Sequence, residues 1–206
     1  MPSKEYWDRV YNSSTSDSLS WFQSRAAVSL DLIHATGAGH AAAIVDVGGG
    51  TSTLVDDLLA NGYTDLSVLD LSAAALTEAQ RRLGEQARKV QWLEADITQA
   101  ELPKKRYDIW HDRAVFHFLT TQKERDAYVR NVYYSVKPGG HVIIATFAED
   151  GPDKCSGLPV MRYRADDLHD EFGEAFTLLK HQKETHQTPL GTEQQFMYCY
   201  CRRVNS

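Results

Sequence analysis

The sequence lacks the features that mark membrane-spanning and disulfide-bonded proteins. No apolar run in its 206 residues approaches the roughly 20 consecutive residues that a membrane-spanning helix needs. Cysteine is scarce, and Cys155, Cys199 and Cys201 form no CxxC pair, so we expect neither a disulfide framework nor a metal site. Residues 1–12 lack the long apolar core of a secretion signal. We therefore expect a soluble, cytoplasmic protein with no membrane partner.

Positive charge is also in short supply. The formal net charge is -6 at pH 7, whereas proteins that bind nucleic acid through its phosphates concentrate Lys and Arg. The densest basic run, Lys104 to Arg106, is more typical of a solvated loop. We therefore expect no nucleic-acid partner. Internal repeats and low-complexity segments are absent as well, and the length fits one domain with a single core.

The most informative stretch that is present is Ala43 to Ser52, AIVDVGGGTS. A short apolar run ends at Asp46 and leads into Gly48, Gly49 and Gly50. Glycine has no Cβ, so the backbone there can turn tightly and touch a ligand. The residues that follow have apolar side chains at helical spacing. The unit is predicted to be a strand, a glycine turn and a helix, which is how an open α/β sheet begins a nucleotide site.

Strand-like and helix-like segments alternate along the next hundred residues or so. Further strands are predicted at 66–69, 90–93, 107–111 and 141–147, and helices at 73–83 and 122–136. Such alternation predicts parallel strands joined by right-handed crossovers. Two final strands, 176–184 and 194–202, are too close in sequence for a crossover helix, so we expect them to pair antiparallel.

Acidic residues lie at or just past the C-terminal ends of four predicted strands. These residues are Asp46, Asp70, Asp96 and Asp112. Ligands of open α/β sheets bind outside those strand ends. Asp70 follows Gly50 by 20 residues, a spacing that suits a carboxylate binding ribose hydroxyls. Thr53 replaces the third glycine of the GxGxxG fingerprint, which disfavours a nicotinamide oxidoreductase.

Together these motifs resemble those of the class I S-adenosylmethionine-dependent methyltransferases. The resemblance is carried, in order, by DVGGGT at 46–51, Asp70, ADI at 95–97 and KPGG at 137–140. It implies a Rossmann-like α/β fold with a seven-stranded sheet, mostly parallel, that ends in an antiparallel C-terminal hairpin. It also implies an enzyme whose cofactor is S-adenosyl-L-methionine.

The resemblance also implies how the chain is divided into regions and which residues contact the cofactor. We expect a single domain over 1–206, with an N-terminal helical cap (1–40), a cofactor-binding core (41–150) and a C-terminal helix and β-hairpin (151–206). The glycines approach the methionine part of the cofactor, Asp70 binds the ribose, and Asp96 with Ile97 contacts the adenine. The predicted cofactor contacts are Asp46, Gly48, Gly49, Gly50, Asp70, Leu71, Asp96, Ile97, Asp112, Arg113 and Trp21.

Three residues are candidates for catalysis: Asp112, His117 and His186. Asp112 matches the family's fourth motif, beside the transferring methyl group. His117, or His111 nearby, could remove a proton from the acceptor, although His117 also suits a buried structural position. His186 lies in a predicted loop, Thr185 to Gly191, where it either orients the acceptor or ties the hairpin together.

The acceptor stays open at this point. HDRAVFHFL at 111–119 and ETHQTP at 184–189 resemble a narrower bacterial subgroup of methyltransferases with an uncertain acceptor. YWD at 6–8 and SWF at 20–22 resemble lysine methyltransferases that act on proteins. Because the cap could close a pocket over the site, we favour a small-molecule acceptor. The alternatives are a protein lysine N-methyltransferase and a cofactor-binding protein without catalysis.

Overall fold

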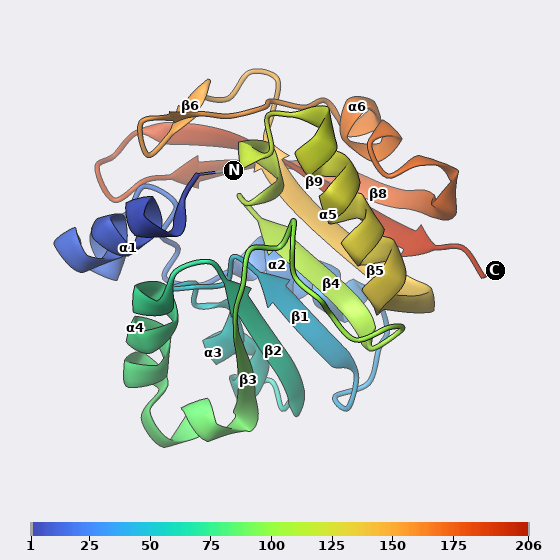
Figure 1. Cartoon of the computed structure of the whole chain (residues 1–206), viewed down its shortest axis with the longest axis horizontal. Coiled ribbons are helices and arrows are strands. Elements are labelled where there is room, and N and C mark those ends of the chain that lie inside the picture. Colours follow the sequence, from blue (N-terminus) through green and yellow to red (C-terminus); the bar gives the residue numbers. More distant parts are fainter. Residues whose placement is uncertain (1, 206) are drawn as a thin grey trace.

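A seven-stranded sheet organises the computed structural model, which describes residues 2–205 (Figure 1). The strand order is β3-β2-β1-β4-β5-β9-β8. The strands are β1 Ala43–Val47, β2 Asp65–Asp70, β3 Val90–Glu94, β4 Tyr107–Arg113, β5 Val136–Phe147, β8 Phe176–Gln187 and β9 Glu193–Arg203. The first five pair in parallel, and β9 runs antiparallel to β5 and β8. The predicted fold class is confirmed.

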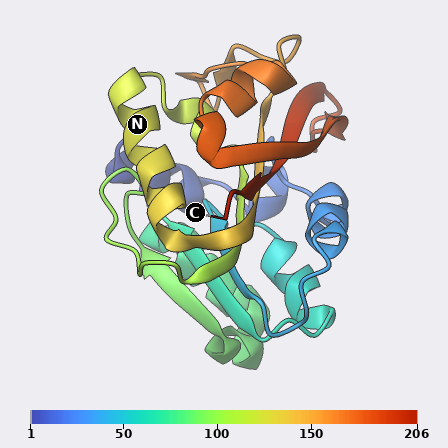
Figure 2. The ribbon, with the colours of Figure 1, turned by 90° about the vertical axis from the view of Figure 1, so that its right-hand side faces the viewer.

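Helices cover both faces of this sheet, as Figure 2 shows for α2 and α5, which lie on opposite sides of it. The α-helices are α1 Lys4–Ser13, α2 Ala27–Ala35, α3 Leu54–Ala60, α4 Ala73–Leu83, α5 Gln122–Ser135 and α6 Ala165–Asp170. Short 3-10 helices are η1 Ser16–Ser18, η2 Gly84–Lys89, η3 Phe116–Phe118 and η4 Gly173–Ala175. A small hairpin joins β6 Lys154–Cys155 to β7 Leu158–Pro159. None of the helices within 2–205 is long and apolar enough to span a bilayer.

The starts of α4 and α5 follow from capping side chains that the sequence displays. Ser72 accepts a hydrogen bond from the backbone N–H of Ala75, as predicted for the start of α4. Thr121 and Glu124 form a reciprocal capping box at the start of α5. The helix predicted to end at Val136 ends at Ser135 instead. Val136 already belongs to β5, so the KPGG segment lies within this strand.

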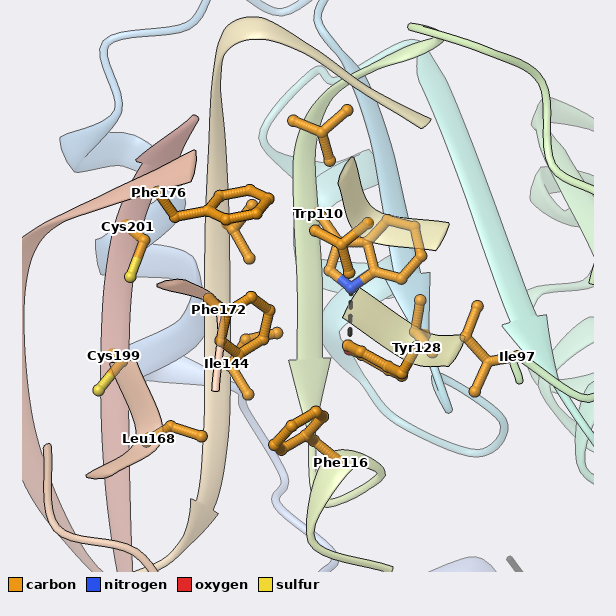
Figure 3. Close-up of a cluster of buried hydrophobic side chains, with 14 of the residues drawn as sticks. Ile97, Trp110, Phe116, Tyr128, Ile144, Leu168, Phe172, Phe176, Cys199 and Cys201 are labelled. Carbon is orange, nitrogen blue, oxygen red and sulfur yellow. Dashed lines mark hydrogen bonds between the residues drawn. The ribbon is translucent and has the colours of Figure 1, made fainter. Parts of the chain in front are cut away.

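Two apolar clusters hold the layers together, one on each face of the sheet. Residues of α2, α3 and α4 pack on one face. On the other face, Trp110 of β4 donates a 2.9 Å hydrogen bond to the hydroxyl of Tyr128 in α5 (Figure 3). Cys199 and Cys201 are buried core residues of this second cluster. Burial raises the pKa of each thiol to about 12, which keeps both protonated.

The C-terminal hairpin differs from the prediction in its length. We predicted that the first strand ends at Glu184 and that a loop follows, but β8 continues to Gln187. Thr185, His186 and Gln187 pair with Gln195, Gln194 and Glu193 of β9. The loop prediction for Thr185 and His186 is therefore wrong. The reason is that these polar residues complete backbone pairing at the edge of the sheet, which composition alone did not indicate.

Candidate active site

The glycine turn between β1 and α3 is packed against acidic and apolar side chains. Gly48 has a φ of +70°, a conformation that residues with a Cβ adopt rarely. A Cβ there would lie 2.0 Å from Val115 Cγ2, while one at Gly49 or Gly50 would lie 2.5 Å from a carboxylate oxygen, of Asp46 and of Asp70 respectively. The missing side chains therefore let two carboxylates lie directly against the turn.

Asp70 ends β2 at this turn. Its side chain accepts a 2.8 Å hydrogen bond from the backbone N–H of Ser72, and the residue is only 7% exposed. Burial raises the pKa of Asp70 from its ordinary value to about 7. Near neutral pH this carboxyl group is therefore only partly ionised, and further hydrogen-bond donors would favour the ionised form.

Asp46 lies deeper, beside His111. The register between β1 and β4 sets these two residues side by side, and His111 Nδ1 lies 2.7 Å from one oxygen of Asp46. The second oxygen of Asp46 is buried and has no hydrogen-bond partner among the described residues. The hydrogen-bond partner of Asp46 is therefore His111, on the neighbouring strand.

Two adjoining pockets lie around the glycine turn. The first is bounded by strand-end residues and by aromatic residues of the N-terminal segment: Val47, Gly48, Asp70, Leu71, Ile97, Val115, Trp7, Tyr11 and Trp21. The second extends past the turn and is bounded by Asp46, Gly48, Gly49, His111, Ser29 and Gln23, among others. Gly48, Tyr11, Trp21 and Arg113 line both. The pockets are therefore neighbours on either side of these four residues.

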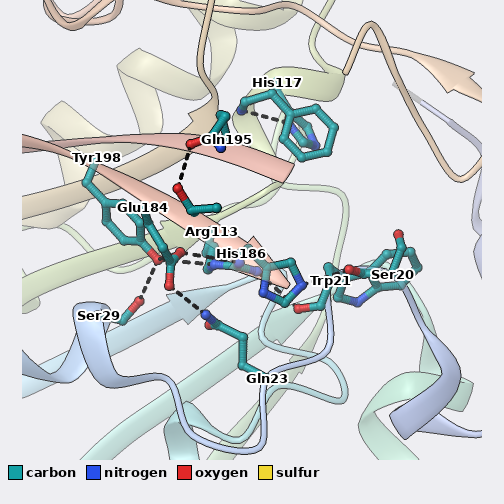
Figure 4. Close-up of polar contacts among 12 residues, drawn as sticks. Ser20, Trp21, Gln23, Ser29, Arg113, His117, Glu184, His186, Gln195 and Tyr198 are labelled. Carbon is teal, nitrogen blue, oxygen red and sulfur yellow. Dashed lines mark hydrogen bonds and ion pairs between the residues drawn. The ribbon is translucent and has the colours of Figure 1, made fainter. Parts of the chain in front are cut away.

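Arg113 ends β4 and lines both pockets. Figure 4 shows its side chain among those of Glu184 and Tyr198. Its guanidinium donates to the carbonyl of Trp21 and to the hydroxyl of Tyr198, each at 3.1 Å, and lies 3.4 Å from Glu184. Gln23 donates to the other oxygen of Glu184 at 2.7 Å. The segment around Trp21 is thus fixed to β4 and β8, and the charge of Arg113 is compensated.

His186 holds the same segment from β8. Its Nε2 lies 2.8 Å from the carbonyl oxygen of Ser20, and burial lowers the pKa of the imidazole. A neutral ring donates its Nε2–H to this carbonyl. His186 lines neither pocket. The geometry matches the structural alternative, a tie, rather than an acceptor-orienting residue, and the element that it ties is the N-terminal segment.

Besides Gly50, three more predicted site residues line neither pocket. Side chains alternate along β4, so Asp112 points to the face opposite His111 and accepts from Val115 N–H, Phe116 N–H and the Tyr128 hydroxyl. Asp96 accepts from the backbone and hydroxyl of Thr98. Such contacts are typical of turn-stabilising carboxylates.

His117 is the third of these. It is fully buried, its Nδ1 accepts a 3.3 Å hydrogen bond from Phe147 N–H, and burial lowers the pKa of His117 to about 3. A base this weak, without contact to a pocket, is poorly suited to remove a proton at neutral pH. We therefore give it no chemical role.

The sequence patterns did not predict some of the residues at the site. Ser29 contacts His111 across 82 positions of the chain, Tyr198 contacts Arg113 across 85, and Gln23 contacts Glu184 across 161. One usable signal existed: Ser29 is the one polar residue among the buried residues of α2, and it is only 1% exposed. A lone polar residue on a buried helix face needs a hydrogen-bond partner.

The fold agrees with comparisons to known proteins. The methyltransferase domain family matches residues 44–140, from β1 through the glycine turn to the KPGG segment. Residues 44–140 form a methyltransferase domain. The predicted family of class I S-adenosylmethionine-dependent methyltransferases is thereby confirmed, and with it the enzyme class and the cofactor. No curated protein matches the sequence.

Solved structures show how widely this methyltransferase fold is shared. A protein described for the conversion of a disulfide bond into a thioacetal group during echinomycin biosynthesis is 21% identical, with a TM-score of 0.79 over 98% of this chain and 93% of that one. The 1,6-didemethyltoxoflavin-N1-methyltransferase of Burkholderia thailandensis is 16% identical, with a TM-score of 0.67 over 98% and 84%. N-methyltransferase NodS of Bradyrhizobium japonicum is 16% identical, with a TM-score of 0.65 over 86% of each chain. At these identities the likeness concerns the fold.

Proposed function

We propose that this enzyme transfers the methyl group of S-adenosylmethionine to a small-molecule acceptor. The first pocket is the observation that carries the proposal. There the strand-end residues Asp70 and Ile97 face Trp7 and Trp21 of the N-terminal segment across one space. Pockets that are mostly apolar, with a few placed polar groups, are typical of small-molecule sites.

The residues around the two pockets fit the cofactor. Asp70 offers a carboxylate for ribose hydroxyls, and Leu71 with Ile97 offers apolar contacts for adenine. Gly48 and Gly49 present bare backbone to the second pocket, beside the unpartnered oxygen of Asp46. This set provides binding groups for the nucleoside and the amino-acid ends of the cofactor.

The chemistry requires little from the protein beyond alignment. The cofactor supplies a methyl group that is electrophilic because it is bonded to a sulfonium. The residues around the pockets bind and orient the two substrates and exclude water. The acceptor atom is thereby held close to the methyl carbon and in line with it. We assign no general base, because His117 is a weak base and Asp112 is fully engaged.

The position of α1 favours a small acceptor over a protein. Asp8 accepts a 2.6 Å hydrogen bond from the Ser72 hydroxyl, and Lys4 lies 2.5 Å from Glu94. On the other side of α1, the hydroxyl of Tyr6 donates a hydrogen bond to the backbone carbonyl of Ser156. α1 is thus fixed to α4, β3 and the β6–β7 hairpin, over the strand ends. Two of the structural neighbours, those described with toxoflavin and echinomycin chemistry, add support for a small acceptor.

The test is a transfer assay with methyl-labelled S-adenosylmethionine and fractionated cell extract, after which protein and small-molecule products are separated. We expect label in the small-molecule fraction, with formation of S-adenosylhomocysteine, and much less label with Asp70→Ala when the cofactor concentration is below saturation. Label in protein would instead support the lysine methyltransferase alternative. Cofactor binding without label in any fraction would support a non-catalytic binding protein.

A further inference from the structure

A line of buried polar side chains connects α2 to the glycine turn. Ser29 Oγ lies 2.8 Å from His111 Nε2, and His111 Nδ1 lies 2.7 Å from Asp46 Oδ1. The three residues are 1%, 2% and 3% exposed. They come from α2, β4 and β1, so the line exists only in the folded protein.

The chemistry of the three groups gives this line a direction. A carboxylate oxygen accepts hydrogen bonds, so His111 donates its Nδ1–H to Asp46 Oδ1. The other ring nitrogen, Nε2, lies 2.8 Å from the Ser29 hydroxyl, which also lies 3.4 Å from the hydroxyl of Tyr198. Ser29 therefore fixes the plane of the His111 ring, and His111 fixes Oδ1 of Asp46. The rotation of the Asp46 carboxylate is set by residues that lie behind it.

The other oxygen of Asp46, Oδ2, forms no hydrogen bond with Ser29 or His111. Oδ2 is buried, has no partner among the described residues, and lies against Gly49 in the lining of the second pocket. A buried acceptor without a donor costs free energy, and more so when it is charged. Arg113 is the one Lys or Arg in that lining, and it is engaged by Glu184, Tyr198 and Trp21. No donor among the described residues reaches Oδ2, so a ligand in this pocket can supply one.

We propose that Ser29 and His111 are positioning residues that aim Asp46 Oδ2 at the ammonium group of the cofactor's amino-acid end. The inference rests on the proposed use of S-adenosylmethionine. An ammonium group brings three N–H donors and a positive charge, and the hydrogen bond that it forms with a carboxylate is among the strong ones. The pair thus makes the site selective for adenosine ligands that carry an amino-acid end.

Two ligands separate this role from a structural one. S-adenosylhomocysteine carries the amino-acid end, whereas 5′-methylthioadenosine has the same nucleoside and sulfur without it. With calorimetry on the intact chain, we expect Ser29→Ala and His111→Phe to weaken S-adenosylhomocysteine binding by roughly tenfold, with 5′-methylthioadenosine affinity unchanged. His111→Asn should restore part of the loss, because its amide N–H can replace Nδ1–H.

Controls keep the outcomes distinct. Ser135 is also a buried serine whose hydroxyl has no partner among the described residues, but it lies on α5, so Ser135→Ala should change neither affinity. Asp46→Asn serves as a second variant if His111→Phe fails to fold, with the same selective loss expected. Equal losses for both ligands would overturn the inference. If the unaltered protein binds neither ligand, the proposed function itself fails.

Discussion

Gly48→Val should abolish cofactor binding in a protein that still folds. The φ of +70° at Gly48 is unfavourable for a β-branched residue, and the new Cβ would fall 2.0 Å from Val115 Cγ2. Val115 itself lines the first pocket. Any shift that relieves the clash therefore moves the wall against which the cofactor would lie. The measurement is calorimetric titration with S-adenosylhomocysteine, together with a thermal melt.

The chain offers a matched control for this prediction at Gly37. This glycine has the same φ of +70°, but a Cβ there would meet no atom within 4 Å. Gly37→Val should lower the free energy of unfolding by about 1–3 kcal/mol through backbone strain and leave cofactor affinity unchanged. If both variants bind the cofactor normally, the glycine turn does not border the cofactor site.

Asp70→Asn should weaken S-adenosylhomocysteine binding by about 1.5 to 3 kcal/mol, the usual contribution of a hydrogen bond to a charged group. The carboxylate can accept from two ribose hydroxyls, whereas an amide offers one acceptor oxygen. A folded variant with unchanged affinity would show that Asp70 does not bind the ribose.

The same residue predicts a pH dependence. Because burial raises the pKa of Asp70 to about 7, the unliganded protein increasingly holds a protonated carboxyl group as the pH falls below that value. Binding that requires the ionised form must then displace a proton, so affinity should fall by up to about tenfold per pH unit below pH 7. Asp70→Asn should lack this decline. A decline of equal slope in the variant would assign it to another group, such as Asp112, whose pKa burial also raises to about 7.

Local sequence patterns were sufficient to predict the frame of the site. The strand that ends at Asp46 and the strand that ends at Asp70 were both recognisable from short apolar runs. Because parallel strands end at one edge of a sheet, their carboxylates were expected to gather at the glycine turn, and both do. The start of α4 at Ser72 was predictable for the same reason, since a cap is encoded within four residues.

The contacts that complete the site were not predictable in this way. Glu184 lies 71 positions from Arg113, and His111 lies 82 positions from Ser29. Such contacts depend on how β8 and α2 pack against the rest of the protein, and a local sequence pattern does not predict that packing. Asp112 shows a second limit: it follows an apolar strand as Asp46 does, yet the alternation of β4 turns it to the opposite face. His111 and Asp112 are adjacent on this strand, yet the side chain of His111 lines a pocket and that of Asp112 accepts hydrogen bonds from a buried turn.

The most direct test of the account is a crystal structure of this protein with S-adenosylhomocysteine. We expect the adenosine in the first pocket, with the ribose hydroxyls at Asp70 and the adenine beside Leu71 and Ile97. The amino-acid end should pass Gly48 into the second pocket and place its ammonium at Asp46 Oδ2. Density for the ligand outside these two pockets, or an amino-acid end directed away from Asp46, would contradict the account.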